Sequence, residues 1–243
     1  NIADDKNELN IKKKNLLIFK NDFINKNFDN LIIKNMWILM EENKISIKIV
    51  EDLFDGIESD LNEVVKFNKK KELLIYSYRV AGTVGLMMAK ILGVQNKNSM
   101  KSAIDLGIAM QLTNISRDVI EDMNNNRFYI NHDFETIKNT LSMADLFYES
   151  SFASIKEIPF RFRFAILVAR RIYRKIGAKI LHKENIYNYN RSGKIYVANL
   201  GKLYQTFLSI LDLIKLIFIN EKNHLRNKEH LLINEEIDLN ERI

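Results

Sequence analysis

The chain has 243 residues, of which 47% are hydrophobic, and it contains one proline, eight glycines and no cysteine. The hydrophobic content is ample for a buried core, and the lack of cysteine excludes a disulfide framework, thiolate metal sites and cysteine catalysis. The formal net charge of +6 accompanies no basic patch interleaved with aromatic residues, so we do not expect nucleic acid as a partner.

The scarcity of helix breakers and the periodic spacing of apolar residues predict an all-α protein. We expect one helical domain over residues 1–220, followed by a charged tail over 221–243 that is a loosely attached helix or disordered. No apolar run approaches the roughly 18 residues of a transmembrane helix. The chain opens at Asn1 within what reads as a helix, so we expect its true N-terminus to lie further upstream.

The first predicted helices precede residue 70. Residues 16–37 alternate apolar and polar clusters, which predicts one or two short helices. Residues 46–67 carry apolar side chains at three- and four-residue steps, which predicts an amphipathic helix. Asp60 lies on this predicted helix, and we assign it to the solvated face, with an inward-facing position as the alternative.

The next predicted helix, residues 71–92, is nearly apolar all round after Val80 and should be central in the fold. Gly82 and Gly85 each cost about 1 kcal/mol relative to alanine in a helix interior. Their presence indicates that something approaches the backbone closely. A neighbouring helix and a long hydrophobic ligand explain it equally well.

Further helices are predicted over residues 99–122, 137–158, 161–182 and 196–220. Ser99 is the expected N-cap of the first of these, and Pro159 separates the second from the third. The four histidines are scattered along the chain, and we assign them no functional role.

Polar residues gather near the end of the 99–122 helix. On a helix, Gln111, Asn114, Asp118, Glu121 and Asp122 fall within about 100° of arc. Neighbouring carboxylates repel one another, so the cluster calls for a compensating cation. Oxygen ligands without cysteine or histidine favour Mg²⁺, which usually completes its shell with waters and substrate phosphates. The stripe therefore predicts a phosphorylated substrate.

Two segments together resemble the squalene and phytoene synthase family. They are residues 76–86 (YSYRVAGTVGL) and residues 109–129 (AMQLTNISRDVIEDMNNNRFY), and within the family VAGTVGLMM looks most like phytoene synthases. The resemblance implies an all-α isoprenoid synthase fold. In it, helices surround a deep apolar cavity, and two aspartate-rich motifs face each other across its mouth.

The resemblance also implies roles for individual residues. Asp118 and Asp122 match the second aspartate-rich motif, with Glu121 between them and Asn114 as a further expected Mg²⁺ ligand. The expected catalytic residues are Tyr76, Arg117, Asp118 and Asp122, and the expected substrate-binding residues are Gln111, Arg117, Tyr173, Val80, Ala81, Val84, Gly85, Lys194 and Lys202. Lys194 stands where arginine is frequent in the family. A lysine keeps the positive charge, but it cannot form the two parallel hydrogen bonds of a guanidinium group.

The first motif of the family has the form DxxxD. Residues 1–4 (NIAD) resemble its last four positions, which makes Asp4 an expected metal ligand and places the first aspartate before Asn1. In the rival register, Asp4, Asp5 and Glu8 form a degenerate motif. In the preferred register we expect this fragment alone to be inactive.

The activity implied by the resemblance is phytoene synthesis, in which two geranylgeranyl diphosphates are joined head to head through prephytoene diphosphate in carotenoid biosynthesis. The expected cofactor is Mg²⁺, with Mn²⁺ as a substitute, and NADPH is not expected. The alternatives are a squalene or dehydrosqualene synthase that uses farnesyl diphosphate, and a relative without activity that serves as an assembly factor. The intact carboxylates argue against the last alternative.

The expected partners are therefore prenyl diphosphate substrates, and the sequence does not define an oligomeric state. We expect a cytoplasmic location, with peripheral association at a membrane surface for product release as a further option.

Overall fold

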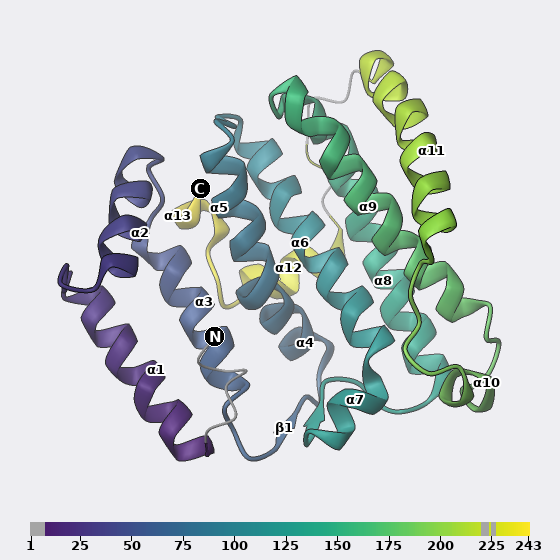
Figure 1. The fold of residues 1–243 in the computed structure, drawn as a ribbon, viewed down its shortest axis with the longest axis horizontal. Coiled ribbons are helices and arrows are strands. Elements are labelled where there is room, and N and C mark those ends of the chain that lie inside the picture. The colour runs from purple at the N-terminus through teal and green to yellow at the C-terminus, as the bar shows by residue number, and fades with distance from the viewer. Residues whose placement is uncertain (1–7, 220–223, 225–226) are drawn as a thin grey trace.

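The computed structural model of the chain describes residues 8–219, 224 and 227–243 (Figure 1). The first part contains α1 (Leu9–Ile24), α2 (Leu31–Glu42), α3 (Ile47–Ser59) and β1 (Val65–Lys66). The middle contains α4 (Lys70–Ser77), a π-helical segment η1 (Tyr78–Gly82), α5 (Thr83–Ile91), α6 (Lys97–Arg117), α7 (Val119–Asn124) and β2 (Arg127–Phe128). The last part contains α8 (Phe134–Phe152), a 3₁₀ segment η2 (Ala153–Glu157), α9 (Phe160–Leu181), α10 (Ile186–Arg191), α11 (Asn199–Phe218), α12 (Lys228–Asn234) and α13 (Leu239–Arg242).

The helix boundaries follow local capping. Ser46 caps α3 by accepting a hydrogen bond from the Lys48 amide. The predicted N-cap at Ser99 is wrong, because α6 begins two residues earlier at Lys97. The side chain of Asn96 caps it by accepting from the amides of residues 98 and 99. The helix predicted over 46–67 ends at Ser59, and β1 follows as a short extended segment.

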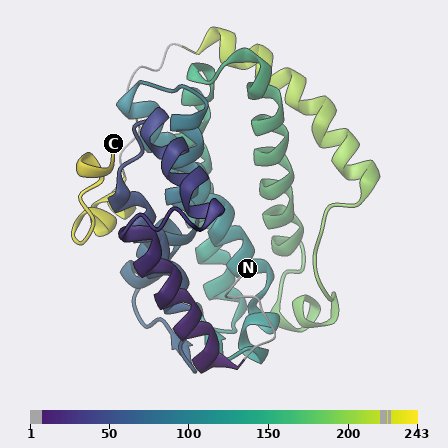
Figure 2. The same ribbon diagram turned by 60° about the vertical axis from the view of Figure 1, so that its left-hand side comes forward.

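Helix α6 is at the centre of the fold. It packs against η1, α5, α8 and α9, and its Ile104, Ile108 and Leu112 are at most 1% exposed. Figure 2 shows α9 and α11 on the side of the molecule opposite α12 and α13. The prediction of an all-α fold is confirmed, with a single two-residue parallel pairing of β1 with β2 in the described chain.

Two glycines allow α6 to approach η1 and α5 closely. A Cβ atom on Gly85 would lie 2.2 Å from the carbonyl oxygen of Ala103, and one on Gly107 would lie 2.2 Å from that of Ala81. Such distances are far inside van der Waals contact. The glycine in the helix at residue 85 is therefore explained by a neighbouring helix, the first of the two sequence-based explanations.

The described part of the predicted tail folds back onto the helical bundle, where α12 packs against α4. The Asp105 carboxylate is 2.6 Å from Nε2 of His224 and 2.9 Å from Nε2 of His230, and it also accepts from the Ser150 hydroxyl. Arg242 on α13 donates to Asp52 on α3, at 3.0 Å from Nε. The prediction of a loose or disordered tail thus differs from the structure, since hydrogen-bonding partners over 100 residues away hold the tail.

The spacing of these histidines and Asp105 resembles that of a metal site, but the hydrogen bonds of His230 favour a cluster without a metal ion. The ligand atoms of Asp105, His224 and His230 lie within 4.8 Å of one another. However, Nδ1 of His230 accepts a hydrogen bond from the Asn227 amide at 3.0 Å. A neutral ring then carries its proton on Nε2 and donates it to Asp105. We therefore interpret the trio as a structural hydrogen-bond cluster.

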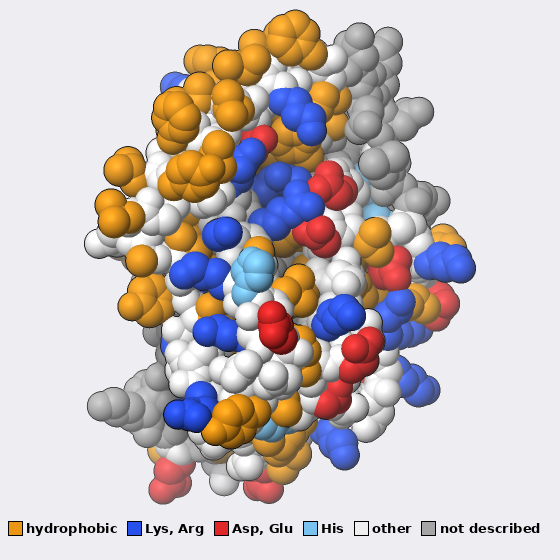
Figure 3. Space-filling view, turned by 90° about the vertical axis from the view of Figure 1, so that its right-hand side faces the viewer, with side chains coloured by type: hydrophobic (Ala, Val, Ile, Leu, Met, Phe, Trp, Pro, Cys, Tyr) orange, Lys and Arg blue, Asp and Glu red, His pale blue; other side chains and the backbone are white. Residues whose placement is uncertain are grey.

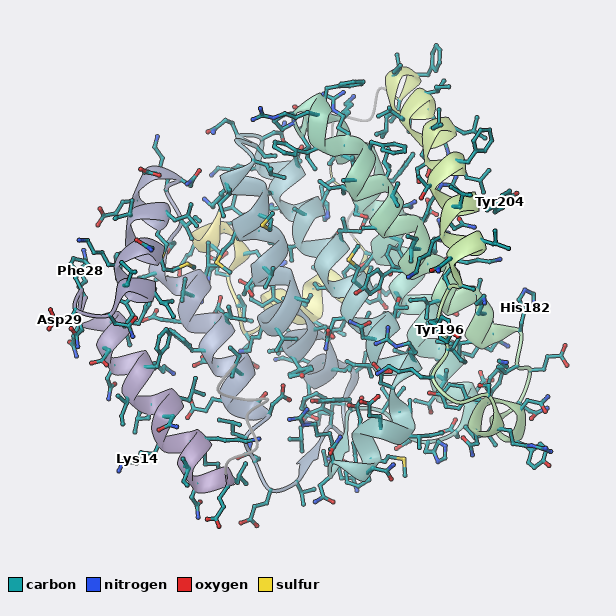
Figure 4. The ribbon with its side chains drawn as sticks, in the orientation of Figure 1. Lys14, Phe28, Asp29, His182, Tyr196 and Tyr204 are labelled. Atoms are coloured by element: carbon teal, nitrogen blue, oxygen red, sulfur yellow. The ribbon has the colours of Figure 1, made fainter. Side chains whose placement is uncertain are left out.

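None of the helices in the described ranges combines the length and hydropathy needed to cross a bilayer. Helix α11 nevertheless presents a row of exposed apolar side chains on the face of the molecule shown in Figure 3. Tyr204 on α11 lies at the outer edge of the bundle (Figure 4), and Tyr196, just before α11, is exposed as well. The exposed apolar residues of α11 are Leu200, Leu203, Tyr204, Phe207, Ile210, Leu211, Ile214, Ile217 and Phe218.

Candidate active site

The carboxylates of the stripe lie where α6 passes into α7. The helix breaks at Asp118, but helical hydrogen bonds continue, from the Asp118 amide to the Asn114 carbonyl at 2.9 Å and from the Asp122 amide to the Asp118 carbonyl at 2.8 Å. The Tyr189 hydroxyl bonds the carbonyls of residues 116 and 117, at 3.0 and 2.8 Å, and so engages the backbone at the break. The predicted i, i+4 spacing of Asn114, Asp118 and Asp122 therefore survives the break.

Two cations contact this carboxylate cluster. Arg117 donates through Nε and Nη2 to both oxygens of the neighbouring Asp118, with the Nε bond at 2.8 Å. Lys194, from the loop after α10, lies 2.7 Å from an oxygen of Glu121 and 3.6 Å from one of Asp118. The structure thus brings Lys194 to the stripe, 73 residues along the chain from Glu121.

The remaining carboxylate, Asp122, has a raised pKa. Burial, followed by the nearby charge of Asp118, raises the pKa of Asp122 from 3.8 to about 7, against the opposing effect of Arg127. Burial disfavours the charged form, and a second negative charge disfavours it further. A bound cation would reverse both effects, so the electrostatics of Asp122 fit a site built around a positive ion.

The donors in the cluster fit Mg²⁺. Within the part of the chain that the structure describes, the buried Oδ1 of Asn114 has no hydrogen-bond partner. A buried amide oxygen without a partner costs free energy, and a metal ion would satisfy it. Asn114, Asp118, Glu121 and Asp122 would supply only oxygen ligands, which Mg²⁺ prefers. Asp4, the ligand expected from the other motif, lies outside the described residues.

A cavity of about 580 Å³ opens beside the stripe, between η1, α5, α6, η2 and α9. Its volume lies within the range typical of ligand sites. Gln111, Asn114 and Tyr173 supply polar atoms to a lining that is otherwise mainly apolar. The structure places in this one lining six of the residues expected to bind substrate: Val80, Ala81, Val84, Gly85, Gln111 and Tyr173.

Two expected residues lie elsewhere. Tyr76 is 6% exposed and does not line the cavity; its hydroxyl donates to Asp60 and lies 3.0 Å from the Tyr129 hydroxyl. Lys202 is exposed on α11, a helix that contributes no described residue to the lining. Their assigned roles remain predictions.

Sequence reasoning missed several residues around this site. Asp60 faces inward, which was the less favoured alternative, and it receives hydrogen bonds from both Tyr76 and Tyr129. Arg127 interacts electrostatically with Asp60 and Asp122. The only signal for Asp60 was its position one turn after Ile57 on the amphipathic pattern, and nothing in the sequence paired it with tyrosines.

The family model described as squalene/phytoene synthase matches residues 2–134. The chain is 37% identical over 147 residues to 15-cis-phytoene synthase of Paracoccus sp., covering 53% of this chain and 48% of the relative. It is 35% identical over 150 residues to 15-cis-phytoene synthase of Pantoea ananas, covering 53% and 48%. The chain thus spans about half the length of these curated relatives.

Relatives of lower sequence identity match a larger part of the chain. Phytoene synthase 1, chloroplastic, of Zea mays is 31% identical over 186 residues, covering 65% of this chain and 44% of the relative. The crystal structure of a dehydrosqualene synthase in complex with ligand superposes with a TM-score of 0.65 at 24% identity, covering 85% of this chain and 78% of that one. This superposition confirms the predicted isoprenoid synthase fold.

Proposed function

Because the chain belongs to the squalene/phytoene synthase family, a family of head-to-head prenyltransferases, we propose that it joins two geranylgeranyl diphosphates to form phytoene. In the first half-reaction, one diphosphate and one proton leave as prephytoene diphosphate forms. In the second half-reaction, the other diphosphate and a second proton leave as the cyclopropane ring opens. This ending needs no reductant, in keeping with the expectation that NADPH is not used.

The observation that carries the proposal is the dual role of α6. One stretch of this helix, from Ser99 to Asn114, lines the apolar cavity, and the next turn carries Asp118. Fifteen residue steps of α-helix extend about 22 Å, so the cavity wall is long enough to lie along an extended prenyl chain. A diphosphate at the stripe would leave its hydrocarbon tail against that wall.

Cationic side chains would assist loss of the diphosphate. When an allylic C–O bond breaks, negative charge develops on the leaving oxygens, and fixed positive groups stabilise it. Arg117 and Lys194 are fixed at the stripe by their bonds to Asp118 and Glu121. Mg²⁺ held by Asn114, Asp118, Glu121 and Asp122 would neutralise the diphosphate as a Lewis acid.

The cavity wall would protect the carbocation. An allyl cation reacts with water, so the site must keep water away from the cation. The side chains of Val80, Ala81 and Val84 in its lining are apolar. At Gly85 and Gly107 the backbones of α5, η1 and α6 are in direct contact.

The decisive experiment is incubation of the complete protein with geranylgeranyl or farnesyl diphosphate and Mg²⁺, with and without NADPH, followed by identification of the hydrocarbon. Phytoene from the C20 substrate without NADPH is the expected result. Consumption of only the C15 substrate would overturn the phytoene assignment in favour of squalene or dehydrosqualene synthesis. Absence of any prenyl transfer would overturn the enzymatic proposal itself.

We also propose peripheral contact with a lipid surface, since the product would be insoluble in water. The exposed apolar row of α11 supports this, because burying such side chains at a bilayer interface is favourable. Flotation with lipid vesicles tests it. Replacing Leu203 and Phe207 by serine should reduce the bound fraction, and unchanged binding would contradict the assignment to α11.

A further inference from the structure

Asp60, the residue that follows α3, holds two tyrosine hydroxyls with one carboxylate. Tyr76 donates to Oδ2 at 2.8 Å, and Tyr129 donates to Oδ1 at 2.6 Å. Both tyrosines are 6% exposed. Hydrogen bonds from neutral donors to a carboxylate are among the stronger ones in proteins, and burial strengthens them. These three residues are called the Asp60 trio below.

The rings of the Asp60 trio are fixed as firmly as its hydroxyls. The Tyr76 and Tyr129 rings stack with centroids 4.8 Å apart and planes 20° apart. Phe67 packs against both, at 5.3 and 5.4 Å. The Phe67 amide donates to the Phe128 carbonyl at 3.1 Å, which extends the pairing of β1 with β2. The short pairing of β1 with β2 therefore places Phe67 and Tyr129 next to Tyr76.

The number of protons fixes the direction of each hydrogen bond. Each tyrosine hydroxyl has one proton, and the carboxylate is the strongest acceptor within reach of both. When both protons point to Asp60, none remains for the contact between the two hydroxyl oxygens, which are 3.0 Å apart. The Tyr76 oxygen is then available to any other group only as an acceptor. Burial, followed by the Asp60 charge, raises the pKa of Tyr76 above its usual value, so the hydroxyl stays protonated.

The Asp60 trio is coupled to the carboxylate stripe and to the cavity wall. Arg127 interacts electrostatically with Tyr129, Asp60, Tyr76 and Asp122. Along the chain, Tyr76 is one helical turn before Val80, which lines the cavity. The trio thus adjoins both parts of the proposed site, although it lines neither the cavity nor the metal position.

We infer that Asp60 is a positioning residue for prenyl transfer, which acts by fixing Tyr76 in one orientation and by placing a negative charge beside its ring. This inference rests on the proposed function. A fixed charge and an electron-rich ring stabilise a carbocation more than they stabilise the neutral substrate. Asp60 should therefore lower the barrier of the reaction and leave substrate binding nearly unchanged.

The test compares three variants of the complete protein: Asp60→Asn, Tyr129→Phe and the control Asp55→Asn. Asp55 lies on α3, the helix that Asp60 follows, and its carboxylate accepts from Lys20 at 3.0 Å. The Asp60→Asn substitution would keep the size of the side chain, but it would remove the charge and turn an NH₂ group toward one tyrosine. We expect Asp60→Asn to lower kcat by at least about tenfold with KM within about twofold. Tyr129→Phe should have a smaller effect on kcat, and Asp55→Asn none.

A spectroscopic measurement tests the geometry without depending on turnover. Ultraviolet absorbance follows tyrosine ionisation as pH rises, and the chain has nine tyrosines. In the wild-type protein, Tyr76 and Tyr129 should resist ionisation together with the other tyrosines whose pKa burial raises, Tyr78, Tyr148 and Tyr189. In Asp60→Asn, Tyr76 and Tyr129 should ionise at lower pH than in the wild type, because the neighbouring negative charge is gone, and the other three should be unchanged.

The outcomes separate this inference from the proposed function. A wild-type protein that makes no hydrocarbon from either substrate overturns the proposed function and the positioning role together. An active wild-type protein with unchanged kcat in Asp60→Asn overturns the positioning role alone. The role is also overturned if kcat in both trio variants falls only in proportion to the amount of folded protein. If Asp60→Asn does not fold, an unchanged kcat in Tyr129→Phe overturns it.

Discussion

Lys194 lies 2.7 Å from a carboxylate oxygen of Glu121, so a loop late in the chain reaches the carboxylate stripe at the end of α6. Both side chains are more than half exposed. Exposed ion pairs contribute about 0–1 kcal/mol to stability. The pair therefore contributes little to the stability of the fold, and we infer that Lys194 serves to bind a ligand.

Replacement of Lys194 by alanine should affect binding of the diphosphate far more than folding. We expect the thermal midpoint to change little, and KM for the prenyl diphosphate to rise about tenfold, which corresponds to about 1.4 kcal/mol for a lost charge-assisted bond. Steady-state kinetics and thermal unfolding check this. Lys194→Arg should restore most of the affinity because it keeps the charge. An unchanged KM in Lys194→Ala would show that the lysine does not contact the diphosphate.

Asp122→Asn provides the cleanest test of the metal assignment. Asp122 is partly buried beside Asp118 with a raised pKa, so the neutral isostere should not destabilise the fold. It does remove a proposed Mg²⁺ ligand, and we expect product formation to fall by at least about 100-fold.

The matched control is Asp145→Asn, which removes an exposed carboxylate that accepts from Arg174 at 2.7 Å. It should retain wild-type activity. Asp118→Asn should be inactive too, but it also breaks the bidentate bond to Arg117, so some loss of stability is expected. Wild-type rates in Asp122→Asn would contradict the metal assignment.

The sequence predicted the stripe well because its geometry is local. Residues at i, i+3 and i+4 share a helix face wherever the helix lies, so Asn114, Asp118 and Asp122 could be grouped without a fold. Boundaries were less predictable, since an Asn96 cap and a distant Tyr189 hydroxyl determine where α6 begins and is broken.

Non-local partners explain the rest of what was missed. Asp60 lies 16 residues from Tyr76 and 69 from Tyr129, and Asp105 lies 119 and 125 residues from its two histidines. Each such residue looks like an ordinary polar position on an amphipathic helix. Only the packing of whole helices brings the partners together, and periodicity carries no information about it.

The raised pKa of Asp122 predicts how stability depends on pH in a solution without divalent cations. Its pKa is about 7 in the folded chain and 3.8 in the unfolded chain, so the folded form binds more protons between these values. The free energy of unfolding should therefore fall as pH rises from about 4 to about 7. Urea unfolding with a chelator, at several pH values, measures this.

Asp122→Asn is the reference for this measurement, because it lacks the titrating group. Relative to the variant, the wild type should lose stability across that pH range, and added Mg²⁺ should restore part of the loss at pH 7. Parallel pH profiles for the two proteins would mean that Asp122 is not buried against Asp118 as the structure has it.

The glycines of α6 and α9 provide a matched pair for testing the cavity wall. A Cβ on Gly107 would lie 2.2 Å from the Ala81 carbonyl oxygen, which is backbone and cannot move alone, so η1 would have to shift. A Cβ on Gly177 would meet only the tip of the Leu141 side chain, at 3.2 Å. Alanine is favoured over glycine by about 1 kcal/mol in a helix, so the two substitutions differ mainly in the clash.

We therefore expect Gly107→Ala to lower the free energy of unfolding by about 1–3 kcal/mol, the usual cost of overpacking, while Gly177→Ala is neutral or stabilising. Ala81 and Gly107 both line the cavity, so a shift of η1 away from α6 would also change its shape. Gly107→Ala should then alter KM for the prenyl substrate in the fraction that remains folded. If the two variants are equally stable, a Cβ on residue 107 does not clash with the Ala81 carbonyl oxygen, and η1 lies further from α6 than the 2.2 Å distance indicates.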